Sequence, residues 1–330
     1  MSEESKIEDK LEQFPIIGKF NVPDVFPVII KNQKIDPTKN LDLPKYKEGT
    51  LVNPNEGYYI HRMDKATEFI TEKNDLKKLF NDLIIIDFIA DNIRTVSKYK
   101  DGKIISERKK IGVSINNIFW IVPDLLIIRG SKETSKNFKR SFERIFKKDI
   151  ILGDSYKFNP WFFLWIISKH RTKEELDNDF YVDLILDMGV EGEVEDLIGR
   201  IVTAKHSLDV TKSISVLLPL LARKLPREFL FGITVDNLTC VIKLNKNGSI
   251  LVSQTRGKLK DLSDLDKTIL TCFFIRKVIQ LYEKWESLPK LEKFPSPEFI
   301  KNIVQECRER GYEITADVTA TIDMYKEKRK

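Results

Sequence analysis

The side chains best able to do chemistry in this sequence are a dense group of cations. Residues 94–149 contain fifteen Lys and Arg against six Asp and Glu, a net charge of +9, whereas the whole chain of 330 residues carries only +6. Cations gathered in one stretch favour an anionic partner, because they concentrate positive potential on one surface. A phosphate backbone suits such a group, since phosphate contacts release counterions and relieve the repulsion among the cations.

An Asp-Gly pair inside this stretch predicts how the cations are arranged. Asp101-Gly102 lies between residues 93–99 and 103–110, which indicates a β-hairpin with a two-residue turn. Side chains alternate between the faces of a hairpin, so five cations share one side with a single acid, Glu107. These five are Arg94, Lys98, Lys100, Lys103 and Lys109. Neither side is convincingly apolar, so we expect the tip of the hairpin to project into solvent.

A second basic element follows the hairpin. Residues 133–148 have the period of an amphipathic helix, with Phe138, Phe142, Ile145 and Phe146 on the apolar side. The helix carries five further cations: Lys136, Lys139, Arg140, Arg144 and Lys147. We interpret the ten cations of hairpin and helix as the candidate nucleic-acid-binding residues.

Two other interpretations of the basic stretch stay open. Lysines on an exposed strand also prevent edge-to-edge aggregation of sheets, without any ligand. Alternatively, the basic surface docks onto an acidic protein, or onto the acidic segment 174–196 of another copy. That segment has ten carboxylates and no Lys or Arg.

Two acidic patterns raise the possibility of metal chemistry. Carboxylates that converge, as those of residues 174–196 could, hold Mg²⁺ or Mn²⁺. Asp91 with Glu107 and Lys109 has the spacing of a nuclease site in which two carboxylates bind metal. However, the hairpin register puts Asp91 on the opposite face from Glu107 and Lys109. A metal-dependent nuclease is therefore the second alternative, and we expect no metal site.

The sequence contains no motif that points to a common enzyme class. It lacks the glycine patterns of P-loop and dinucleotide-binding proteins, the serine-hydrolase elbow and the H-E-x-x-H zinc motif. The three histidines, His61, His170 and His206, each adjoin Lys or Arg, and we expect them at the surface or at helix ends. We expect no cofactor, and we favour a non-enzymatic function.

The composition is that of a globular chain in a reducing compartment. Hydrophobic residues make up 42% and charged residues 32% of the sequence. The three cysteines are far apart and form no C-x-x-C pair, which favours a cytoplasmic location. The polar N-terminal residues do not resemble a signal peptide, and the longest apolar run, residues 161–167, is too short to span a membrane.

The periodicities predict an α+β fold with two mixed layers, in which antiparallel β-meanders are each covered by helices. Residues 1–55 contain six prolines and are expected to form an irregular N-terminal arm with one short strand near residues 26–30. Residues 56–155 form the basic α+β domain with the hairpin 93–110. Residues 156–330 form a helix-rich α+β domain with a meander at 229–252, a core helix at 263–288 and a frayed basic tail at 325–330.

The leading hypothesis is therefore a nucleic-acid-binding protein that uses the hairpin and the adjacent helix. Its contacts are expected to be mostly with phosphates, to DNA or RNA or another polyanion, with little sequence specificity.

Overall fold

The computed structural model describes residues 25–39, 41–63, 65–147, 149–192, 200–205, 209–253 and 261–330. The fold is α+β, and the chain forms two compact units that divide between Ser155 and Tyr156. Residues 261–273 group with the first unit and residues 274–330 with the second. The predicted domains 56–155 and 156–330 stay predictions. The part of the predicted arm that precedes Val25 lies outside the described residues, and so does His206.

The first unit is built on an antiparallel sheet with the order β2-β3-β4-β5-β1, to which β6 adds beside β1. Its strands are β1 (Val25–Gln33), β2 (Glu56–His61), β3 (Leu83–Lys100), β4 (Lys103–Ile121), β5 (Leu125–Arg129) and β6 (Ile150–Ser155). Its helices are α2 (Glu68–Thr71), α3 (Asn74–Asp82) and α4 (Lys132–Phe146). The strand expected near residues 26–30 is confirmed within β1, and the described residues of the range 34–55 are irregular apart from an isolated bridge at Lys45.

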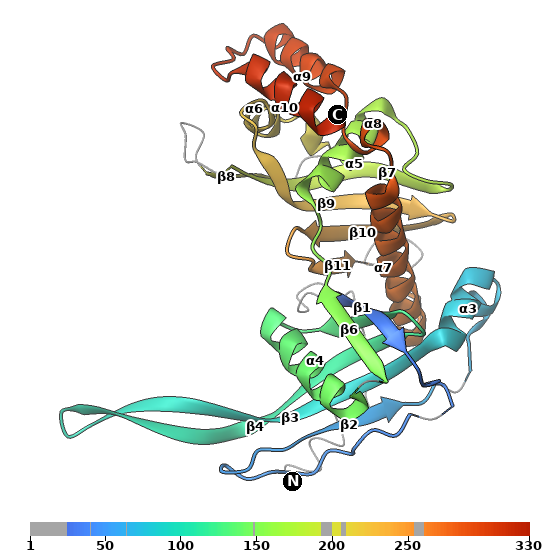
Figure 1. Cartoon of the computed structure of the whole chain (residues 1–330), viewed down its shortest axis with the longest axis vertical. Helices are drawn as coiled ribbons and strands as arrows, with labels where there is room; N and C mark the ends of the chain where they lie inside the picture. Colours follow the sequence, from blue (N-terminus) through green and yellow to red (C-terminus); the bar gives the residue numbers. More distant parts are fainter. Residues whose placement is uncertain are drawn as a thin grey trace. The chain divides into compact units, whose positions relative to one another are not determined.

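Helix α4 covers one face of this sheet (Figure 1). The Ser131 hydroxyl caps the helix by accepting a hydrogen bond from the Thr134 amide at 3.1 Å. Phe138 and Phe142 are fully buried, and the Phe142 ring meets Trp120 of β4 edge to face at 5.5 Å. Burying one such side chain contributes roughly 1.5–3 kcal/mol, so the phenylalanine face holds the helix on the sheet.

The second unit has a sheet with the order β11-β10-β9-β7-β8. Its strands are β7 (Phe180–Glu191), β8 (Ile201–Ala204), β9 (Leu225–Val235), β10 (Leu238–Asn245) and β11 (Ile250–Ser253). Its helices are α5 (Pro160–Thr172), the 3-10 turn η1 (Val210–Lys212), α6 (Ile214–Leu221), α8 (Lys290–Lys293), α9 (Pro297–Glu309) and α10 (Val318–Arg329). Helix α7 (Asp264–Ser287) contributes its residues from Phe274 onward to this unit.

The predicted meander is confirmed in β9, β10 and β11. Leu244 pairs with Ile250 and Ile242 with Val252, as a three-residue loop at 246–248 requires. Gly248 in that loop has φ +91, and a side-chain carbon there would lie 1.7 Å from the Tyr156 carbonyl oxygen, so only glycine fits. The C-terminal tail departs from the prediction: it belongs to α10, where Tyr325 is buried and packs on Trp161 with ring centroids 5.0 Å apart.

Candidate nucleic-acid interface

The predicted hairpin is the outer half of a longer two-stranded ribbon formed by β3 and β4. Lys100 pairs with Lys103 and Arg94 with Lys109, as the turn at Asp101-Gly102 predicted. Both turn residues have positive φ, 51 and 76, which is the conformation that a tight hairpin turn requires. Residues of β3 before about Arg94 are largely buried and those after it largely exposed, so the ribbon leaves the body of its unit at that point (Figure 1).

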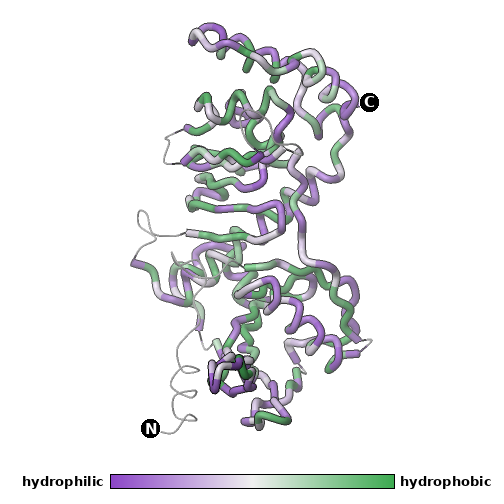
Figure 2. Tube along the Cα trace, turned by 90° about the vertical axis from the view of Figure 1, so that its left-hand side faces the viewer, coloured by the Kyte–Doolittle hydropathy of each residue, from purple (hydrophilic) through white to green (hydrophobic). Residues whose placement is uncertain are grey.

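One face of the ribbon is cationic, and we call it the lysine face. It carries the five predicted cations together with Val96, Ile105 and Glu107. Glu107 accepts a hydrogen bond from Lys98 at 3.1 Å, and both side chains are about half exposed. That contact lowers the pKa of Glu107 and raises the pKa of Lys98. In Figure 2 the ribbon is viewed end-on and is mostly hydrophilic.

The opposite face of the ribbon has a different chemistry, and we call it the hydroxyl face. Its outer part consists of Thr95, Ser97, Tyr99, Ile104, Ser106 and Arg108. Tyr99 and Ile104 lie directly opposite each other, and they are 79% and 75% exposed. Behind them, the Ser97 and Ser106 hydroxyl oxygens are 3.4 Å apart. The tip therefore presents lysines on one side, and apolar and hydroxyl groups on the other.

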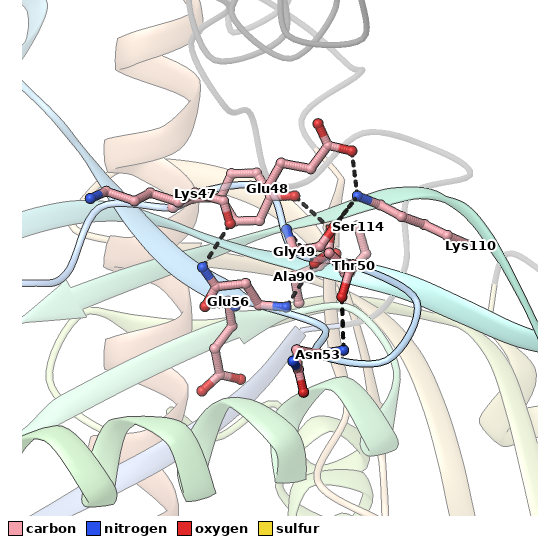
Figure 3. Close-up of polar contacts among 12 residues, drawn as sticks. Lys47, Glu48, Gly49, Thr50, Asn53, Glu56, Ala90, Lys110 and Ser114 are labelled. Atoms are coloured by element: carbon pink, nitrogen blue, oxygen red, sulfur yellow. Dashed lines mark hydrogen bonds and ion pairs between the residues drawn. The ribbon is translucent and has the colours of Figure 1, made fainter.

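The base of the ribbon is fixed by a buried carboxylate. The Asp91 side chain is solvent-inaccessible and accepts hydrogen bonds from the Tyr46 hydroxyl at 2.7 Å and from the Gly49 and Asn55 amides at 2.9 and 2.7 Å. Lys110 of the facing strand lies 2.9 Å from Asp91 and also donates to Glu48 at 2.5 Å (Figure 3). Loop 46–55 is thereby tied to the point where the ribbon emerges.

These contacts set the ionisation of the Asp91 carboxyl. Burial acts to raise its pKa, but hydrogen bonds from Asn55, Tyr46 and Lys110 outweigh burial, so the pKa lies below its ordinary value. A β-bulge lies next to this site: Asn92 pairs with Gly112 and Ile93 with Lys110, which leaves Ile111 unpaired. Bulges bend and twist a strand, so this one helps to set the direction of the ribbon.

The three predicted arginines line one groove of about 630 Å³ in the first unit. Arg94 comes from β3, and Arg140 and Arg144 from α4. Glu56 at the start of β2 forms an ion pair with Arg144 and accepts a hydrogen bond from Ser141 at 2.6 Å, so the charge of Arg144 is partly balanced. The rest of the lining is largely polar and includes Asn92, Ser114, Asn116, Ser131, Thr134 and Asn137.

The other predicted helix cations lie elsewhere on α4. Lys136 and Lys147 are exposed and do not line the groove. Lys139 points toward β6, where its amino group donates to the Gly153 carbonyl and lies 3.8 Å from Asp154; its side chain is only 18% exposed. The groove thus gathers Arg94, Arg140 and Arg144, while the tip gathers Lys98, Lys100 and Lys103.

The two acidic patterns do not converge among the described residues. Asp91 contacts Lys110 and loop 46–55, whereas Glu107 faces the other way and contacts Lys98. In the described part of the acidic segment, Glu174 pairs with Lys169, and Glu191 pairs with Lys246. No group of three or more His, Cys, Asp or Glu able to hold a metal ion occurs in the described part of the chain. Glu193, Glu195 and Asp196 lie outside it.

Sequence reasoning missed several groups at this interface. The amide side chains of Asn92, Asn116 and Asn137 line the groove, but nothing in their spacing distinguishes them from surface asparagines. Tyr99 and Ile104 could have been found, because an apolar pair at the tip of a hairpin with two polar faces has no core to enter. The histidine expectation is wrong for His61, whose buried ring lies 2.8 Å from the carboxylate of Asp87.

A comparison with known proteins found no matching family model and no significantly similar curated protein. Within the described residues, no helix is long and apolar enough to cross a membrane.

Proposed function

We propose that this protein binds nucleic acid, using the lysine face of the ribbon and the arginine-lined groove beside α4. The observation that carries the proposal is the exposed outer part of the ribbon, residues 94–109, whose cations contribute nothing to a core. Like charges placed so closely repel one another, and a phosphate chain would relieve that repulsion while releasing its own counterions.

The groove adds a second set of phosphate contacts to the proposal. Arginine binds phosphate through two parallel N–H groups, and the asparagine and hydroxyl groups of the groove are further donors to phosphate or sugar oxygens. Because Arg94 belongs both to the ribbon and to the groove lining, a single nucleic-acid strand could run from one to the other. The three cysteines are free and buried, which fits the reducing cytosol that we propose as the location.

The proposal is tested by fluorescence anisotropy with labelled duplex DNA across a series of salt concentrations. The affinity of the wild type should fall steeply with salt, with a logarithmic slope of about 0.9 for each phosphate contact. A variant with Lys98→Gln, Lys100→Gln and Lys103→Gln should bind more weakly at low salt, and its slope should be smaller by about 2–3.

The matched control changes three exposed lysines of the second unit, Lys290→Gln, Lys301→Gln and Lys326→Gln, and removes the same charge. It should bind as the wild type does. Equal loss in both triple variants would mean that net charge, and not the ribbon, sets the affinity. Absence of salt-dependent binding to both DNA and RNA by the wild type would overturn the proposal.

A further inference from the structure

The hydroxyl face of the ribbon has exposed apolar groups that the phosphate contacts of the lysine face do not explain. Tyr99 and Ile104 stand at the tip with most of their surface in water. Large apolar side chains that are exposed side by side are a feature of contact surfaces, because a partner can remove them from water. The hydroxyls of Ser97 and Ser106 lie directly behind them, and Thr95 and Arg108 follow.

The dimensions of the ribbon fit one nucleic-acid surface well. Paired strands are about 4.8 Å apart, and the major groove of B-form DNA, roughly 12 Å wide, admits a two-stranded β-ribbon. The major groove of A-form RNA is deep and narrow, so side chains cannot read it. A ribbon that enters a groove therefore favours duplex DNA over duplex RNA.

The chemistry of the hydroxyl face matches what the floor of that groove presents. Serine and threonine hydroxyls bond to the edges of any base, isoleucine contacts the thymine methyl group, and arginine binds guanine through two hydrogen bonds. Turning the lysine face to the floor would instead leave Tyr99 and Ile104 in water, so their apolar surface would contribute nothing to binding. With the hydroxyl face inward, the flexible lysine chains can reach the phosphates along the groove walls.

We propose that the ribbon enters the major groove of duplex DNA with its hydroxyl face toward the base edges, so that Tyr99, Ile104 and the hydroxyls behind them give the protein a sequence preference. The inference rests on the proposed nucleic-acid binding and deepens it. It also replaces the expectation of little sequence specificity with a definite set of base-contacting residues.

The test is selection of bound duplexes from a random-sequence pool, followed by affinity measurements on a selected and a scrambled duplex. The wild type should enrich a common sequence and prefer the selected duplex at least about tenfold, as one or more good base contacts allow. The variant Tyr99→Ala with Ile104→Ala keeps every charge. It should lose most of this preference while retaining the affinity for the scrambled duplex and the salt slope.

The lysine-face variant Lys100→Gln with Lys103→Gln is the matched control, and it should weaken binding to both duplexes equally. Enrichment of no sequence, or an unchanged preference in the Tyr99/Ile104 variant, would overturn the inference while leaving phosphate binding intact. Equal affinity for duplex RNA of the same sequence would also overturn it. Failure of the wild type to bind any duplex or single strand would instead reject the proposed function itself. Binding to anionic lipid vesicles that depends on Tyr99 and Ile104, in place of DNA, would assign the tip to a lipid surface and overturn the inference.

Discussion

The contacts of the Asp91 carboxylate hold the base of the ribbon in place. The carboxylate accepts hydrogen bonds from two backbone amides and the Tyr46 hydroxyl, and it forms an ion pair with Lys110. It lies in the middle of a strand that becomes exposed three residues later. A buried carboxylate costs free energy unless hydrogen bonds and a counter-charge compensate it, and both are present here.

Replacing Asp91 with Asn should therefore destabilise the first unit near neutral pH. We expect the free energy of unfolding in urea to fall by about 3 kcal/mol, since the charge that holds Lys110 and the two amides is lost. The pKa of Asp91 is lowered in the folded state, so its contribution is present above the unfolded pKa and is lost as the pH falls through the folded one. The difference between the wild-type and variant free energies should therefore begin to shrink below about pH 4, the ordinary range of an aspartate pKa.

The control is Asp101→Asn in the exposed turn, where Asn also tolerates the positive φ and the change should be small at every pH. A difference between the wild type and the Asp91 variant that is the same at about pH 3 as at about pH 7 would contradict the role of the carboxylate charge.

Individual residues of the ribbon could be predicted better than those around Asp91. The Asp-Gly turn specifies which residues face each other, and the predicted register of Arg94 with Lys109 is confirmed. The partners of Asp91 come from residues 46–55, which have no periodicity and lie about forty positions away in the chain. His61 was expected at the surface because Arg62 adjoins it, but β2 pairs with β3 and places the ring beside Asp87.

Elements with a single clear period were predicted closely, and those with a mixed pattern were not. The meander of β9, β10 and β11 alternates regularly, and α4 repeats phenylalanine every four residues, so both are confirmed. The inner part of β4 was not predicted, because Gly112 and the adjacent pair Asn116 and Asn117 break the pattern before the buried Ile118–Ile121 stretch. The predicted hairpin strand 93–99 is likewise only the outer part of β3, which is one strand of 18 residues.

Composition alone gave the wrong structure for the basic tail. Its charges suggested fraying, but α10 runs from Val318 to Arg329 with an Asp317 cap. The Asp317 carboxylate accepts a hydrogen bond from the Ala320 amide at 3.0 Å, and Thr321 donates from a buried position to the Leu221 carbonyl at 2.6 Å. One buried face is enough to hold a helix that ends in a run of charged residues.

The burial of helix α7 leads to a prediction about stability. Phe274 in α7 is fully buried, so Phe274→Ala should lower the free energy of unfolding by about 3–5 kcal/mol through lost transfer energy and a residual cavity. Leu291→Ala is the comparison, because Leu291 is 63% exposed and its truncation should change stability by less than about 0.5 kcal/mol. Similar urea midpoints for both variants would mean that α7 does not organise the core.

The proposed function depends on the segregation of charge along the chain. The periodicities predicted an α+β protein and the charges predicted a basic surface; the α+β fold is confirmed. They could not reveal that three arginines meet in one groove, because Arg94 reaches it from a strand and Arg140 and Arg144 from a helix. Nor could they reveal the chemical difference between the two faces at the tip of the ribbon, which follows from the observed exposure of Tyr99 and Ile104.

Shortening the ribbon should separate an effect on binding from an effect on folding. The pair Arg94–Lys109 has the same place in the alternation of the ladder as the pair Lys100–Lys103 beside the turn. Replacing residues 95–108 with Asn-Gly should therefore close the hairpin with the same kind of turn. The buried parts of β3 and β4 and the arginine-lined groove would be left in place.

The affinity of this shortened protein for duplex DNA, measured by anisotropy at about 50 mM salt, is the most direct test of nucleic-acid binding through the ribbon. We predict a loss of at least about tenfold in affinity with a free energy of unfolding within about 1 kcal/mol of the wild type, because most of the removed residues are exposed. Unchanged affinity in a shortened protein that folds as stably as the wild type would contradict the account.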